Sequence, residues 1–286
     1  MSSPSVFRAF SGVVLMLSLS CFLLLTSAGC GRQGNYVALE DDPFEAETTS
    51  QQAATPNDSA PVESPRSKEP EGIDLSRFGE VRSLFDGQTL SGWSDAAGGE
   101  PIGWEVKDGA LALTDPENGK DIITAEQYTS FIFSFEFRMS YQCNSGVKYH
   151  IHEGQPGSWG GLEYQVQDDA HVEDGKVPAR RIGSIFDVIA AKESSHSGEF
   201  PAPQSEEPTG EFRSGKIVVD GDRIEHWLDG ELVLVCTYGS EEWLSGVAQG
   251  KFKNAKGFGS AKTSPILLQA HGYRVEYRNL TIQTLK

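Results

Sequence analysis

Hydrophobic residues occupy every second position in several segments of the chain. In 131–139, FIFSFEFRM, Phe recurs at alternate positions, and side chains two residues apart on a strand share one face of a sheet. The same alternation flanks Asp-Gly pairs within 103–113 and 215–236. Asp-Gly between alternating segments is typical of β-hairpins. The pattern therefore predicts a strand at 131–139, a hairpin over 103–113 and a three-stranded antiparallel meander over 215–236.

The remaining segments add strands rather than helices. Residues 264–285 predict two further strands with a turn near Gly272, whereas 239–252 hold at most a short helical turn. Residues 191–210 are rich in Ser, Glu and Pro and predict a long loop. A succession of short strands without a long amphipathic helix predicts an all-β fold, a concanavalin-like jelly-roll sandwich of two antiparallel sheets.

Three predicted strands carry polar side chains on the face opposite their apolar one. If they are neighbours in one concave sheet, they line a groove whose amides, imidazoles and carboxylate could hydrogen-bond to sugar hydroxyls. A solvated outer face would give the same pattern without any function. The polar positions are Asn144, Lys148, His150 and His152 in 144–154, Glu163, Gln165 and Gln167 in 161–170, and Gln269 and His271 in 265–272; Trp104, Trp159 and Tyr164 are candidate stacking surfaces.

Other chemistry has weaker support in the sequence. His150 and His152 could share a metal but lack a third ligand in the pattern, and Asp168 with Asp169 could bind a structural Ca²⁺. We expect no metal in the groove and no cofactor, and leave that Ca²⁺ open. Cys143 and Cys236 have no metal-binding spacing; a disulfide between them and two isolated thiols both fit.

The first 76 residues predict export and tethering rather than a core. Residues 1–30 combine Arg8, an apolar run over 13–25 and a small-residue approach to Cys30, which is typical of a lipoprotein signal. Residues 31–76 are acidic and rich in Pro and Ser, so they predict a disordered tether, followed by one domain over 77–286. The net charge of −17 disfavours nucleic acid as a partner, because phosphate would be repelled. We expect an exported protein that meets the membrane only through the lipid on Cys30.

Lipidation can be tested directly. The Cys30→Ser variant should leave the membrane fraction and appear in the soluble fraction, because it lacks the thiol that carries the lipid. Cell fractionation with immunoblotting measures this. Unchanged membrane association would indicate a retained helical anchor instead.

Several segments of the domain follow one another in a specific order and spacing: 83–93, 104–111, 144–151, 161–169, 183–188, 224–230 and 266–282. Together they resemble the 3-keto-disaccharide hydrolase family over nearly all of 80–286. The resemblance implies a concanavalin-type sandwich that cleaves glycosides with a ketone at C3 of the glucose ring. The chain departs from the family at 210–215, where Phe212 and Arg213 replace Trp and Asn.

The implied activity explains why one carboxylate could suffice. A C3 ketone acidifies the C2 proton, so a single base can start elimination of the C1 oxygen before water adds. Glu163 is the expected base, and His150 or His271 the acid or enolate donor. Lys148, Trp159 and Tyr164 are expected to contact a carbohydrate substrate, while Asn144, Gln165 and Gln269 hold its hydroxyls. The alternatives are a non-catalytic, lectin-like module tethered to the surface and a structural lipoprotein.

Overall fold

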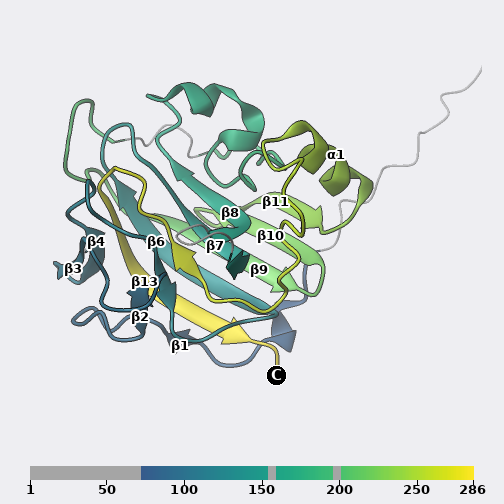
Figure 1. Ribbon diagram of the computed structural model, residues 1–286, viewed down its shortest axis with the longest axis horizontal. Helices are drawn as coiled ribbons and strands as arrows, with labels where there is room; N and C mark the ends of the chain where they lie inside the picture. Colours follow the sequence, from purple (N-terminus) through teal and green to yellow (C-terminus); the bar gives the residue numbers. More distant parts are fainter. Residues whose placement is uncertain (1–71, 154–158, 196–200) are drawn as a thin grey trace, which may run out of the picture. The chain divides into compact units, whose positions relative to one another are not determined.

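Two antiparallel β-sheets face each other across an apolar core (Figure 1). The structure is a computed structural model that describes residues 72–153, 159–195 and 201–286. The larger sheet runs β11 (Glu231–Thr237), β10 (Arg223–Leu228), β9 (Arg213–Asp220), β6 (Phe131–Met139), β13 (Val275–Thr284), β4 (Ala110–Leu113) and β3 (Trp104–Lys107), with β1 (Arg82–Ser83) beside β13. The smaller sheet runs β2 (Trp93–Asp95), β5 (Ile122–Thr124), β12 (Leu267–Leu268), β7 (Asn144–Glu153) and β8 (Trp159–Gln167). The predicted all-β sandwich is confirmed.

The strands predicted from alternation are present with the expected pairing. The β3–β4 hairpin turns at Asp108 and Gly109, both with positive φ, and β9, β10 and β11 form the predicted meander. The helical turn is longer than expected. Helix α1 spans Glu241–Gln249, with Ser240 as its N-cap and Gly250 as its C-cap.

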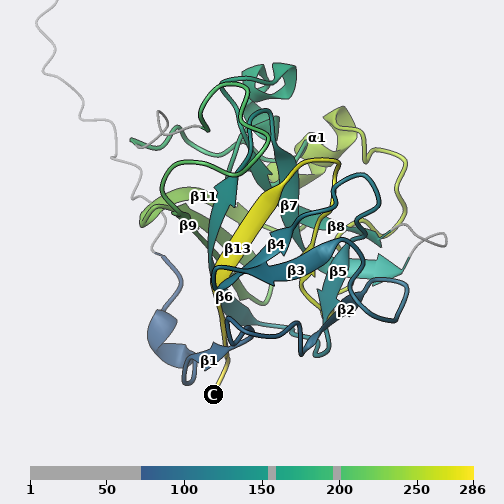
Figure 2. The ribbon, with the colours of Figure 1, turned by 90° about the vertical axis from the view of Figure 1, so that its left-hand side faces the viewer.

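The C-terminal segment forms the two predicted strands with a turn at Gly272, which has a φ of 80°. These strands do not pair with each other. β12 joins the smaller sheet between β5 and β7. β13 crosses to the larger sheet, where it lies between β6 and β4 (Figure 2). Alternation reports which face of a strand is buried and carries no information on which sheet it joins.

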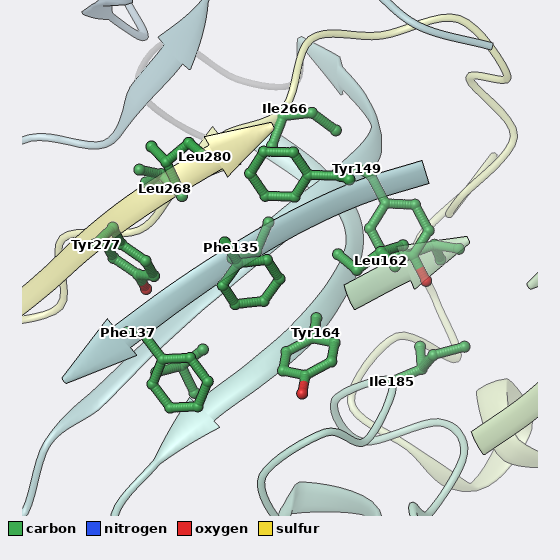
Figure 3. Close-up of a cluster of buried hydrophobic side chains, with 14 of the residues drawn as sticks. Phe135, Phe137, Tyr149, Leu162, Tyr164, Ile185, Ile266, Leu268, Tyr277 and Leu280 are labelled. Carbon is green, nitrogen blue, oxygen red and sulfur yellow. The ribbon is translucent and has the colours of Figure 1, made fainter. Parts of the chain in front are cut away.

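The core lies between the sheets and is aromatic (Figure 3). Phe135 of β6 contacts Phe133, Phe137, Tyr164 and Tyr277 with ring centroids 5.3 to 6.3 Å apart. Such stacked, edge and tilted contacts add to the free energy of burying the rings. The alternate Phe positions of β6 therefore form the centre of the core, as the sequence predicts.

The start of the described chain packs on the outer face of the larger sheet. Ile73 and Phe78 lie against Ile132 and Val218, and the Ile73 N–H donates to Glu225 Oε1 at 2.7 Å. The predicted tether boundary at residue 76 is therefore wrong by a few residues. The expected signal, Cys30 and most of the tether lie outside the described residues. None of the described helices is long and apolar enough to span a membrane.

The two remaining cysteines do not form a disulfide. Cys143 and Cys236 are both buried free thiols. Burial raises the pKa of Cys236 to about 12 and that of Cys143 further, so both stay protonated and unreactive at neutral pH.

Candidate functional site

The three polar segments predicted to be neighbours are adjacent in the smaller sheet. Lys148 in β7 lies opposite both Leu267 in β12 and Glu163 in β8. β12 continues past its two paired residues, because the Gln269 N–H donates to Gly146 O at 2.9 Å. Lys148, Glu163 and Gln269 thus meet on the face of this sheet that points away from the core.

Glu163 occupies the centre of this face. A Cβ added at Gly146 would lie 2.6 Å from Glu163 Oε1, so the carboxylate fills space that only glycine leaves open. Lys148 Nζ lies 3.7 Å from Oε2. The Gln269 amide satisfies both neighbours when its nitrogen donates to Oε1 (3.3 Å) and its oxygen accepts from Lys148 Nζ (3.0 Å). Glu163 is 6 % exposed.

Burial raises the pKa of Glu163 above its ordinary value. The positive charges of Lys148, Lys251 and His271 lower it, and Asp121 raises it further, but desolvation dominates. A carboxylate with a raised pKa holds a proton more readily near neutral pH and is a better general base.

A second carboxylate at the site, Asp121, was missed by the sequence analysis. It directly precedes β5, is half-buried, and accepts the Ala270 N–H at 2.8 Å. Burial raises its pKa, while the charges of Lys148 and His271 lower it. Its place in a loop gave no periodic signal. In the structure, Asp121 lies on the same face as Ile123, which pairs with Leu267.

His271 stands at the exposed edge of this site. It follows Gln269 by two residues, and its charge affects the pKa values of both Glu163 and Asp121. An open groove of about 580 Å³ begins at the next residue, Gly272, with Tyr141 and Tyr273 in its wall.

His150 does not lie on this face, which corrects the sequence expectation. The β7–β8 register shifts between Tyr149 and His152, and His150 adopts a φ of 47°. This bulge turns the ring, which is 0 % exposed, against Tyr149 of the core. Burial and the charge of Lys262 lower the pKa of His150 to about 4. A fully buried ring that is turned off this face is out of reach of a ligand beside Glu163.

The two glutamines after Glu163 support a loop rather than bind substrate. Gln165 Nε2 donates to Asn144 Oδ1 (3.1 Å) and to Gln167 Oε1 (3.0 Å), and Gln167 Nε2 donates to Asp169 Oδ1 and to Arg180 O. Both glutamines are 0 % exposed. This chain of amides ends under residues 168–187, whose backbone pairs with the edge of β8. Only Asn144, half-buried at the end of the chain, stays within reach of a ligand.

The aromatic residues proposed for stacking lie elsewhere. Tyr164 is buried in the core and donates to Trp227 O at 3.0 Å (Figure 3), and Trp104 is buried with its indole N–H on Lys120 O. Both assignments as stacking surfaces are wrong, because these rings belong to the core faces of their strands. The Trp159 side chain lies outside the described residues.

The candidate metal positions are occupied by protein donors. Asp168 accepts the Gln142 N–H and contacts His171 Nδ1 at 2.9 Å, and Asp169 accepts the Ile182 N–H. In the described ranges, no three His, Cys, Asp or Glu side chains are grouped as metal ligands.

The pair at 212–213, where the chain departs from the family, lies away from the site. Phe212 packs under Arg138, and Arg213 pairs with Asp229 on the larger sheet.

Comparison with known proteins places the domain among the carbohydrate-active hydrolases. A Parabacteroides distasonis crystal structure provisionally described as a glycosyl hydrolase is 27 % identical, with a TM-score of 0.62 over 72 % of this chain and 94 % of that one. A 3-keto-disaccharide hydrolase of Bacteroides thetaiotaomicron is 26 % identical over 71 % of this chain and 78 % of its own length. Residues 80–283 match the 3-keto-alpha-glucoside-1,2-lyase-like domain, and the chain belongs to this family.

Proposed function

We propose that the domain cleaves glycosides whose glucose ring carries a ketone at C3. The observation that carries the proposal is Glu163, a buried carboxylate with a raised pKa between a lysine and an amide. The Bacteroides relative is named for the hydrolysis of 3-keto-disaccharides, which supports the same substrate class here.

The residues of the face can be given roles in such a reaction. Glu163 takes the C2 proton, and the electron pair moves to the C3 oxygen to form an enolate. The enolate then expels the C1 oxygen, leaving a C1=C2 double bond, while His271 at the open edge gives that oxygen a proton. Water adds across the double bond to complete a net hydrolysis. Lys148 keeps Glu163 ionised before the reaction, and Gln269 holds the carboxylate and a substrate hydroxyl.

Asp121 supports a second candidate function. Two carboxylates with raised pKa values on one face could hydrolyse an ordinary glycoside, one as acid and the other as nucleophile or base. That mechanism needs no ketone.

Matched substrates separate these functions. The purified domain is incubated with 3-keto-glucosides of varied aglycone and with the same glucosides lacking the ketone, and released aglycone is measured. Release from the ketone series alone supports the proposal, whereas release from both series supports the two-carboxylate mechanism. Binding without release from either series would identify a lectin-like module.

Gly146 offers a steric test of where the base lies. A Cβ at this position would also come within 2.7 Å of Glu163 Cγ, so Gly146→Ala must displace the carboxylate. We expect turnover of a 3-keto-glucoside to fall by about tenfold to a hundredfold, because small misplacements of a catalytic group have effects of this size.

Gly79→Ala is the matched control. Gly79 also lacks a positive φ, and its added Cβ would come no closer than 3.5 Å to any atom. Its turnover and melting temperature should match the parent. Full activity in Gly146→Ala would show that the position of Glu163 does not matter to the reaction.

A further inference from the structure

Lys251 is held beside the site by a strained aspartate. Asp187 adopts a φ of 59°, an unfavourable conformation for a residue with a side chain. Its Oδ2 accepts the Lys251 N–H at 2.6 Å, and its Oδ1 accepts from Arg180 Nε at 2.6 Å. The Asp187 carboxylate thereby joins the loop that covers the edge of β8 to Lys251, which follows the C-cap of α1.

Glycines in α1 bring that helix close to the same loop. A Cβ on Gly246 would lie 2.2 Å from Val188 O, and one on Gly250 would lie 2.2 Å from Asp187 O. Any larger residue would push α1 away. Figure 1 shows α1 and the loop at the same end of the molecule. The position of Lys251 is therefore fixed by packing as well as by a hydrogen bond.

The Lys251 side chain contacts the loop that pairs with β8 at Glu163, and the charges of Lys251 and Glu163 affect each other's pKa values. The Lys251 Nζ lies 4.0 Å from the centroid of the Phe186 ring, and the Phe186 N–H donates to Glu163 O at 3.0 Å. In the described part of the chain, no carboxylate oxygen lies within ion-pair distance of this Nζ. Lys251 as a whole residue is exposed, while its ammonium group lies over the Phe186 and Phe252 rings.

We infer that Lys251 contacts the substrate and stabilises the negative charge that forms on the C3 oxygen when Glu163 removes the C2 proton. This inference rests on the proposed function and adds a residue to it. The proton moves from C2 to Glu163 and the electron pair to the C3 oxygen; Lys251 keeps its own proton and donates a hydrogen bond. A preorganised donor aimed at developing charge is among the largest contributions to catalysis. Asp187 is a positioning residue for this group.

The pKa of Lys251 is lowered from its ordinary value, mainly by burial of the ammonium group. Glu163 and Asp187 raise this pKa, and Lys148 and Arg180 lower it. Replacement by Arg would retain the charge to higher pH, since a guanidinium does not lose its proton in this range. If Lys251 only stabilised the end of α1, turnover would not depend on the pH at which residue 251 loses its charge.

The test compares wild-type protein with Lys251→Met, Lys251→Arg and, as control, Lys253→Met, an exposed lysine two residues along. Two rates are measured on a 3-keto-glucoside: release of aglycone, and deuterium uptake at C2 from heavy water. We expect Lys251→Met to lower kcat and the exchange rate by about a hundredfold with KM changed little. Lys251→Arg should restore part of both rates and move the alkaline limb of the pH profile upward, and Lys253→Met should match wild type.

Failure of the proposed function and failure of the Lys251 inference give different results. Wild-type protein that neither exchanges nor releases aglycone overturns the proposed function together with this inference. An active wild type with an equally active Lys251→Met overturns the inference alone. A rise in KM at constant kcat, or a lowered melting temperature that accounts for the lost rate, also overturns it. Asp187→Asn should reduce both rates in the same proportion, because it weakens the bond that places Lys251.

Discussion

Glu163→Gln should lower the turnover of a 3-keto-glucoside by about a hundredfold or more. The amide keeps the size of the side chain and can still contact Lys148 and Gln269, but it cannot accept the C2 proton. Steady-state kinetics on wild type and variant measure the effect, and substrate binding should change little. Retained turnover would place the base elsewhere, with Asp121 and His271 the nearest alternatives.

The same substitution should leave the melting temperature unchanged or slightly raised at pH 7. Burial raises the folded-state pKa of Glu163 above 4.5, so the folded protein binds the proton more tightly than the unfolded chain. Stability from this group is therefore complete below pH 4.5 and decreases as pH rises through the folded pKa. Gln removes that dependence, so any gain should disappear in acid. A large loss of stability would assign Glu163 a structural role.

Leu162→Ala should lower the free energy of unfolding by about 2–5 kcal/mol. Leu162 precedes Glu163 but faces the core, where it is 0 % exposed and lies opposite Tyr149 (Figure 3). A Cβ on Gly259 would come within 2.6 Å of Leu162 Cδ2, so the side chain is enclosed and its removal leaves a cavity. Urea unfolding should show a lower midpoint at constant m-value.

Leu244→Ala is the control for this loss. Leu244 is 59 % exposed on α1, and its truncation should change stability by less than about 0.5 kcal/mol. Equal effects of the two truncations would contradict the assignment of Leu162 to the core.

Local pattern was sufficient to predict the faces of the strands but not their partners. The alternation in 131–139 and the Asp-Gly turns depend on residues close in sequence, and the structure confirms them. The separation of β12 from β13 depends on which sheet has an open position, and this is settled by contacts distant in the sequence. The short β12 gave no sign that it would leave its neighbour.

The site was predicted where the period of two persists and missed where it breaks. Lys148, Glu163 and Gln269 follow the period, and the structure brings them together. The bulge in β7 reverses His150, and no residue in that segment signals an inserted position. Asp121 and Lys251 come from a strand end and a helix end, and they reach Glu163 only through tertiary packing. Gln165 and Gln167 follow the period, but the loop over residues 168–187, which follows them directly in the sequence, folds back over their face.

The position of β13 constrains how the chain can fold as it is made. The last ten-residue strand lies in the middle of the larger sheet, between β6 and β4. Until Val275–Thr284 leave the ribosome, both neighbours have an unpaired edge and the aromatic core lacks one wall. Folding must therefore follow synthesis rather than accompany it, and it depends on contacts between distant parts of the chain, which form slowly. Such a chain becomes a catalyst only after its final residues have been made.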